Sequence, residues 1–237
     1  MIETINLAKR FGSKFALNNL SLKIEKGEVF GFLGPNAAGK TTTVKLLVGL
    51  LKPSGGSARI CGYDIQRDYM KAKALLSYIP DEPYLYERLT AREFLRFVSE
   101  IYLMDRAKAA KKIEYLLEFL DMRGYADTLI EEYSHGMRQK LVISAALIHS
   151  PEVIIVDEPM VGLDPKTSRL VKDVFRDNAK KGVTIFMCTH MLSIAEEICD
   201  RIGIIDRGNL IAIGTMDELR KTSGSYGRLE EIFLKLT

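Results

Sequence analysis

Residues 34–41 read Gly34-Pro35-Asn36-Ala37-Ala38-Gly39-Lys40-Thr41, and this stretch is the most informative part of the chain. It fits the pattern G-x-x-x-x-G-K-[S/T] at every position. With ordinary glycine usage, such a match arises by chance on the order of once in a hundred chains of this length. The apolar run 29–33 before it is typical of a buried strand, and a helix is expected over 39–50 after it. The sequence therefore predicts a glycine-containing turn that joins a buried strand to a helix.

This turn has the chemistry of a phosphate-binding loop. Its backbone N–H groups can point inward around an anion, and the N-terminus of the following helix adds partial positive charge. The lysine can reach the β- and γ-phosphates of a nucleotide, and the Thr41 hydroxyl can bind Mg²⁺. A strand–helix turn without a ligand is the alternative, and the surrounding pattern disfavours it. The residues predicted to contact ATP here are Gly34, Pro35, Asn36, Ala37, Ala38, Gly39, Lys40, Thr41 and Thr42.

A second apolar run, residues 153–156, ends in the carboxylates of Asp157 and Glu158. Ligands of parallel sheets bind at the carboxyl ends of the strands, so both carboxylates are expected at the same edge as the loop. Asp157 is then placed to hold Mg²⁺, and Glu158 to orient or deprotonate the water that attacks the γ-phosphate. Many buried strands end in an acidic turn, so this pair acquires a functional meaning only beside the loop.

The order of predicted elements indicates an α/β fold. Helical patterns occupy the block from Thr90 to about Ser150, and strands alternate with helices after Pro151, which favours a mainly parallel sheet. We interpret 1–237 as a single domain with a core of 1–88 and 151–237 and a helical subdomain of 89–150. The predicted strands are 16–24, 29–33, 153–157, 183–189, 202–206 and 210–213, and the predicted helices include 106–120, 166–180 and 191–199, one starting near 134, and two that follow capping boxes at 90–93 and 215–218.

The bulk composition excludes several classes of protein. A net charge of +3 over 237 residues, with no dense basic block, does not predict nucleic-acid binding. No uncharged apolar run approaches the ~20 residues that cross a bilayer, and the N-terminus does not resemble a signal peptide. Three widely spaced cysteines favour reduced thiols inside the cell. We therefore expect a chain that reaches a membrane only through a partner.

Together these motifs resemble the nucleotide-binding subunits of ABC transporters, over essentially the whole chain. Residues 133–139 resemble the signature segment of that family, residues 162–165 its D-loop, and His190 its switch histidine. Phe11 stands where an aromatic residue stacks on adenine. The resemblance implies a P-loop NTPase core with a mainly parallel sheet, an antiparallel β subdomain and an inserted helical subdomain. It also implies ATP hydrolysis with Mg²⁺ and with Lys40, Glu158 and His190 as catalytic residues.

The same resemblance implies partners. Two ATPase chains pair head to tail, and each ATP lies between the loop of one chain and the signature segment of the other. Asp164 then crosses the interface, and transmembrane subunits hold the chains on the inner, cytoplasmic face of the cell membrane. Residues 229–236 resemble the ending of exporter-type subunits. The residues expected to contact the partner's ATP are Ser134, His135, Gly136 and Met137.

Three positions depart from the family pattern. Ala37 replaces a frequent glycine and is tolerated if its backbone angle suits an L-residue, and His135 replaces the first glycine of the signature segment. Asp81 stands where a glutamine is usual, as a possible Mg²⁺ ligand or a side chain that points elsewhere. Taken singly, Ser134 as a helix cap, His190 at a strand end and Phe11 as a packing residue each have a structural explanation. A soluble ABC ATPase that acts on nucleic acid or ribosomes, and a nucleotide sensor that binds without hydrolysis, are the alternatives at the level of function.

Overall fold

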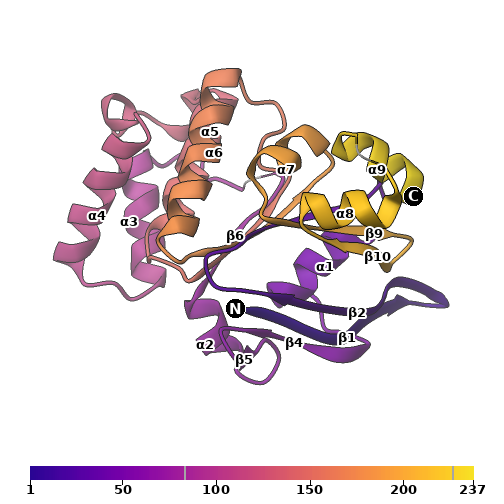
Figure 1. Cartoon of the computed structure of the whole chain (residues 1–237). Helices are drawn as coiled ribbons and strands as arrows, with labels where there is room; N and C mark the ends of the chain where they lie inside the picture. The colour runs from indigo at the N-terminus through magenta and orange to yellow at the C-terminus, as the bar shows by residue number, and fades with distance from the viewer. Residues whose placement is uncertain (83, 226) are drawn as a thin grey trace.

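Two β-sheets with a helix between them form the centre of the computed structural model, which describes residues 1–82, 84–225 and 227–237 (Figure 1). The strands are β1 (Ile2–Phe11), β2 (Lys14–Ile24), β3 (Val29–Leu33), β4 (Gly55–Ile60), β5 (Tyr63–Asp64), β6 (Leu76–Ile79), β7 (Val153–Asp157), β8 (Thr184–Thr189), β9 (Arg201–Asp206) and β10 (Asn209–Gly214). The α-helices are α1 (Lys40–Leu47), α2 (Tyr69–Ala74), α3 (Ala91–Ile101), α4 (Arg106–Phe119), α5 (His135–Leu147), α6 (Pro165–Lys180), α7 (Leu192–Ile198), α8 (Met216–Ser223) and α9 (Leu229–Leu236). Short 3-10 turns lie at Arg123–Tyr125 and Ile130–Glu132.

The two sheets differ in strand direction. Within the described residues, one sheet is antiparallel with the order β2-β1-β4-β5. The other has the order β10-β9-β3-β8-β7-β6 and is parallel except for β10, which runs antiparallel to β9. Helices α3, α4 and α5 are inserted between β6 and β7 and lie together on one side of the molecule (Figure 1). The predicted fold class is therefore confirmed.

The central strands are buried on both faces. Every residue of β3, β7 and β8 is buried, as expected for parallel strands covered by helices. Alternate residues of β7 enter different cores: Ile154 and Val156 pack with the side chains of α5 and α6, whereas Val153 and Ile155 pack with α1 and the antiparallel sheet. This double coverage holds the carboxyl end of β7 in a fixed position.

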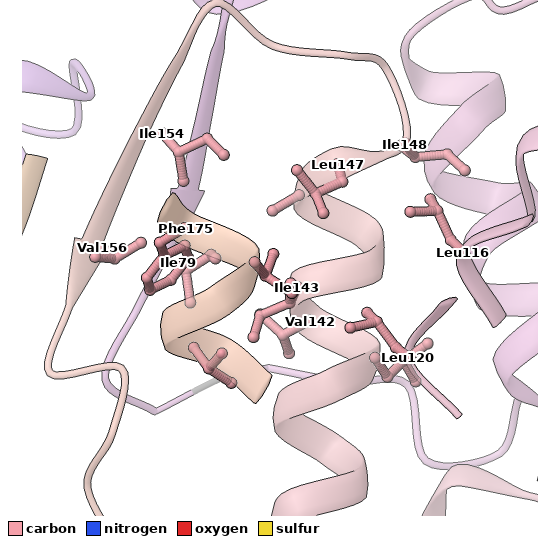
Figure 2. Packing of buried hydrophobic residues seen from close by; sticks show 14 of the residues in the cluster. Ile79, Leu116, Leu120, Val142, Ile143, Leu147, Ile148, Ile154, Val156 and Phe175 are labelled. Atoms are coloured by element: carbon pink, nitrogen blue, oxygen red, sulfur yellow. The ribbon is translucent and has the colours of Figure 1, made fainter. Parts of the chain in front are cut away.

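Helix α5 connects the helical insertion to the parallel sheet. Figure 2 shows Val142 and Leu147 of α5 between the strand residue Val156 on one side and Leu116 and Leu120 on the other. All five side chains belong to one buried hydrophobic cluster. Helix α5 is therefore a rigid link between the two parts, because its apolar side chains are packed against both.

The predicted helix starts are confirmed in detail. Thr90 with Glu93 and Thr215 with Glu218 both form capping boxes, at the starts of α3 and α8. The predicted strands 29–33 and 153–157 have the observed bounds. The helix predicted over 39–50 ends three residues earlier, at Leu47, and the other predicted elements differ by one or two residues at their ends. No helix of the described ranges combines the length and apolar character that crossing a bilayer needs.

Strands β1, β4, β5 and β6 and helix α2 were not predicted. Adjacent glycines such as Gly55 and Gly56 usually indicate a break in regular structure, but β4 starts at Gly55. Gly56 has φ 71°, and a Cβ there would lie 2.2 Å from the carbonyl oxygen of Asn6. The missing side chain thus allows β4 to approach β1, which is the opposite of a break in the sheet.

Candidate functional site

The loop between β3 and α1 is shaped by close backbone contacts. A Cβ at Gly34 would lie 2.3 Å from the carbonyl oxygen of Ile205, so only glycine fits. Gly39 is the N-cap of α1 with φ 114°, a conformation that an L-side chain rarely adopts. The Thr43 hydroxyl donates to the carbonyl oxygen of Gly39 at 2.9 Å. Both glycines of the pattern are therefore required by geometry.

Lys40 lies across this loop. Its Nζ donates to the carbonyl oxygens of Gly34 at 2.6 Å and Pro35 at 3.2 Å, and the residue is only 8% exposed. The ammonium group is thus held at the loop rather than in solvent. This arrangement gives the loop a fixed positive charge beside its N–H groups, which suits a phosphate.

The backbone at Ala37 does not suit an L-residue, contrary to the condition set for it in the sequence analysis. Its φ is 64°, in the left-handed region. That conformation costs an alanine on the order of 1 kcal/mol relative to the right-handed region, and glycine avoids the cost. The side chain is exposed, so backbone conformation alone is responsible.

Asp157 ends β7 and is 5% exposed. Burial, together with the nearby charges of Glu158 and Asp81, raises the pKa of Asp157 to about 6, although a hydrogen bond with Thr41 and the charge of Lys40 oppose the shift. An oxygen-only pair of a carboxylate and a hydroxyl, with excess negative charge around it, fits a hard divalent cation such as Mg²⁺. The described residues contain no group of three or more His, Cys, Asp or Glu side chains able to hold a metal ion.

Glu158 and His190 are in direct contact. The Glu158 Oε1 atom lies 2.8 Å from His190 Nδ1, and the backbone N–H of His190 donates to Glu158 Oε2 at 3.2 Å. Glu158 is held from β8 as well, since its backbone N–H donates to the carbonyl oxygen of Cys188 at 2.9 Å. The His190 side chain is 57% exposed, so a ligand can reach the side of the ring that faces away from Glu158.

A cleft of about 930 Å³ brings most of the predicted site together. It is lined by residues 35–42 of the loop, Phe11, Asp157, Glu158 and His190. Phe11 is 53% exposed and has Lys9 Nζ 5.1 Å from its ring centroid. A cleft lined by an aromatic side chain and by convergent charged groups is the arrangement of a nucleotide site.

Asp81 also lines this cleft. Burial and the charges of Glu158 and Glu82 raise the pKa of Asp81, and His190 opposes the shift. Seven lining residues were not predicted: Lys14, Phe15, Ala16, Val161, Asp206, Arg207 and Gly208. Phe15 was detectable as an aromatic residue in a half-exposed strand, but Arg207 reaches the cleft only through the turn between β9 and β10.

Six of the predicted residues do not line the cleft of their own chain: Gly34, Ser134, His135, Gly136, Met137 and Asp164. Ser134 is the N-cap of α5 and accepts from the backbone N–H of Met137 at 3.3 Å. The ring of His135 lies 3.0 Å, through Nε2, from the carbonyl oxygen of Val161. The segment is exposed or half-exposed, so a role toward a second chain stays a prediction that its position allows.

Asp164 caps α6. Its carboxylate accepts from the backbone N–H groups of Lys166 at 2.9 Å and Thr167 at 3.0 Å, and from the Thr167 hydroxyl at 2.6 Å. The Thr167 bonds hold the pKa of Asp164 below its usual range. The residue is exposed beside the signature segment, since a Cβ on Gly136 would lie 3.5 Å from Asp164 Oδ2. Its role at an interface stays a prediction.

Comparison with known proteins gives a consistent result. The family model described as "ABC transporter" matches residues 17–161. The linearmycin resistance ATP-binding protein LnrL of Bacillus subtilis is 38% identical over 219 residues, which cover 92% of this chain and 70% of that protein. The probable multidrug ABC transporter ATP-binding protein YbhF of Escherichia coli is 36% identical over 240 residues, which cover 100% of this chain but only 41% of YbhF. A solved structure of an ATP binding subunit of an ABC transporter has a TM-score of 0.94 and 31% identity, and the match covers 100% of this chain and 99% of that chain.

Proposed function

Because this chain belongs to the ABC transporter family, we propose that it is the ATP-hydrolysing subunit that powers a membrane transporter, with the cleft above as its nucleotide site. It binds and hydrolyses ATP, as ATP-binding proteins of this family do. The assignment of catalytic residues rests on the contact between Glu158 and His190, which line the same cleft as the phosphate loop.

The Glu158 carboxylate is the general base for hydrolysis. It takes a proton from water while the water oxygen forms a bond to the γ-phosphorus and the bond from that phosphorus to the β–γ bridging oxygen breaks, so that ADP and phosphate leave. A carboxylate can only accept a hydrogen bond, so His190 donates from Nδ1 to Glu158. This bond orients the imidazole so that Nε2 faces the γ-phosphate, to which it donates when the ring carries both protons.

The remaining cleft residues bind and orient the nucleotide. The Lys40 ammonium and the backbone N–H groups of residues 35–41 attract the phosphates, and Phe11 provides a ring on which adenine can stack. Thr41 and Asp157 would hold Mg²⁺, which supplies charge neutralisation for the phosphates when bound. Asp81 adds a second carboxylate at the edge of that site.

Hydrolysis requires two chains in this proposal. Ser134 to Met137 lie outside the cleft of their own chain and are accessible, which supports a head-to-tail dimer in which they reach the ATP of the partner. The N-terminus of α5, capped by Ser134, offers partial positive charge and free N–H groups to the γ-phosphate. Asp164, exposed beside them, lies at the same interface.

The membrane partner is supported by the relatives. The described helices include no membrane span, and the relatives above are named as ATP-binding proteins for linearmycin resistance and probable multidrug transport. We therefore infer separate transmembrane subunits, attachment to the inner face of the cell membrane, and export as the direction of transport. The same names favour a transporter over the alternative of an ABC ATPase that acts on nucleic acid or ribosomes.

Two measurements test this function. Purified protein should release inorganic phosphate from ATP only when Mg²⁺ is present, and Lys40→Ala should abolish both release and ATP binding. A tagged chain should co-purify from detergent-solubilised membranes with a polytopic membrane protein. Wild-type protein that binds no ATP would overturn the site, and recovery of ribosomes or nucleic acid instead of a membrane protein would overturn the transporter assignment.

A further inference from the structure

Two side chains of α5 donate hydrogen bonds to the backbone immediately after Glu158. His135 Nε2 lies 3.0 Å from the carbonyl oxygen of Val161, and Gln139 Nε2 donates to the carbonyl oxygen of Pro159 at 3.2 Å. A carbonyl oxygen only accepts, so Nε2 of His135 carries the proton. The two donors are four residues apart and thus share one face of the helix. They hold alternate carbonyl groups of the same short segment.

That segment needs external support. Glu158 has φ 48°, a left-handed conformation that costs a non-glycine residue on the order of 1 kcal/mol or more and persists only where its surroundings enforce it. A turn follows directly, because the backbone N–H of Val161 approaches the carbonyl oxygen of Glu158 at 3.4 Å. On its other side, the backbone N–H of Glu158 donates a hydrogen bond to the carbonyl oxygen of Cys188 in β8. The position of its carboxylate therefore depends on contacts from both β8 and α5.

We propose that His135 and Gln139 are positioning residues, which hold residues 159–161 so that the Glu158 carboxylate faces the attacking water and His190. This inference rests on the proposed function, in which Glu158 is the general base. It replaces, for His135 alone, the contact with the partner's ATP proposed above, which Ser134, Gly136 and Met137 keep. Because α5 is packed against both the sheet and the helical insertion, it is rigid enough to set this geometry (Figure 2).

The arrangement links two nucleotide sites. One of these hydrogen bonds starts at His135, directly after the cap residue Ser134, and ends at Val161, which lines the cleft of its own chain. These hydrogen bonds therefore link the start of α5, where Ser134 meets the ATP of a partner, to the backbone beside Glu158 of its own site. One chain thus couples binding at one site to the alignment of the base at the other.

The main test compares His135→Leu, which has no donor, with His135→Gln, which keeps a donor on a flexible chain. Loss of one aligned hydrogen bond should lower kcat about three- to tenfold in His135→Leu, with the KM for ATP unchanged, and His135→Gln should recover part of the loss. Lys140→Ala is the matched control, because Lys140 lies on the same helix and its side chain has no hydrogen bond or ion pair within the described part of the chain. Gln139→Met, similar in length and without a donor, should reproduce the fall in kcat.

A second measurement separates positioning from phosphate contact. In a Glu158→Gln background, the ATP concentration that produces half-maximal dimer should be the same with His135 or Leu at position 135. A clear rise in that concentration would mean that His135 contacts the phosphate of the ATP bound by the partner chain, and it would overturn the positioning role proposed here. Wild-type kcat in both His135→Leu and Gln139→Met would also overturn it, whereas absence of ATPase activity in the wild type would instead overturn the proposed function.

Discussion

Glu158 Oε1 lies 2.8 Å from Nδ1 of His190, although the two residues are far apart in the chain. They follow β7 and β8, which are neighbours in the parallel sheet with Asp157 paired to Cys188. Strand register alone thus brings the carboxylate and the imidazole to the same edge. The second carboxylate oxygen accepts the backbone N–H of His190, so the pair is held at two points.

Glu158→Gln should reduce ATP turnover by at least about 10²-fold, because an amide cannot accept the proton of the attacking water. ATP affinity should remain, since the phosphate loop is unchanged, and the uncleaved ATP should hold two chains together. Turnover by phosphate release and mass by light scattering with ATP and Mg²⁺ measure both effects. Wild-type turnover without a dimer would show that Glu158 is not the base.

His190→Asn and His190→Ala should differ in turnover. The asparagine amide can still donate to Glu158 from near the position of Nδ1, but it lacks the nitrogen left for the γ-phosphate. We expect kcat to fall in the order wild type, Asn, Ala, with a loss for Ala on the order of 10²-fold. Equal losses for the two variants would mean that the contact with Glu158 contributes nothing to turnover.

Asp157→Asn should stabilise the nucleotide-free protein at neutral pH. Since the folded-state pKa of Asp157 is raised to about 6, folded protein binds more protons than unfolded protein between about pH 4 and pH 6, and stability falls as pH rises through that window. Above about pH 6 the Asp157 carboxyl is ionised in the folded protein, and its full destabilisation of the fold is present. Urea unfolding without Mg²⁺ should give Asp157→Asn a gain on the order of 1–3 kcal/mol at pH 7.5 and a smaller gain at pH 4.5.

The same variant provides its own control. Stabilisation by ATP with Mg²⁺ should be weaker in Asp157→Asn than in the wild type, because a carboxylate ligand is lost. Thermal unfolding with and without ligand measures this difference. A variant that is less stable than the wild type at pH 7.5 without ligand would contradict the burial argument.

Ala37→Gly and Ala37→Val should have opposite effects. Glycine relieves the left-handed backbone strain but adds freedom to the unfolded chain, so we expect a change in unfolding free energy of about 0 to +1 kcal/mol. Valine is β-branched, so the Ala37→Val variant should have an unfolding free energy lower by more than about 1 kcal/mol and should bind ATP more weakly. Thermal unfolding and ATP titration test both, and a valine variant with wild-type stability would argue against the left-handed conformation.

Phe11→Ala should weaken ATP binding by roughly 1–3 kcal/mol, as expected for the loss of an aromatic–base stack. Binding of inorganic triphosphate should not change, because that ligand has no base. Calorimetric titration with both ligands separates the two contributions. If Phe15→Ala shows the loss instead, adenine stacks on the other aromatic ring of the cleft.

Much of the fold was predictable because burial on both faces leaves a clear pattern. The runs 29–33 and 153–157 are strands with the predicted bounds, and both capping boxes start helices. Strand β1 and its pairing with β4 were not predicted. A strand with a mixture of exposed and buried residues gives weak periodicity, and a glycine such as Gly56 indicates a turn as readily as a close approach between two strands. The phosphate loop was predictable residue by residue, because its chemistry lies within eight consecutive positions.

The linear order of residues thus specifies the loop chemistry, the acidic strand end and the helix caps, since each depends on neighbours a few positions away. Folding alone brings Asp81 beside Glu158, places Phe15 and Arg207 at the cleft, and directs His135 toward Val161. These contacts join residues from separate elements, and their geometry follows from sheet register and from the packing of α5 between the sheet and the helical insertion. No local pattern carries that information.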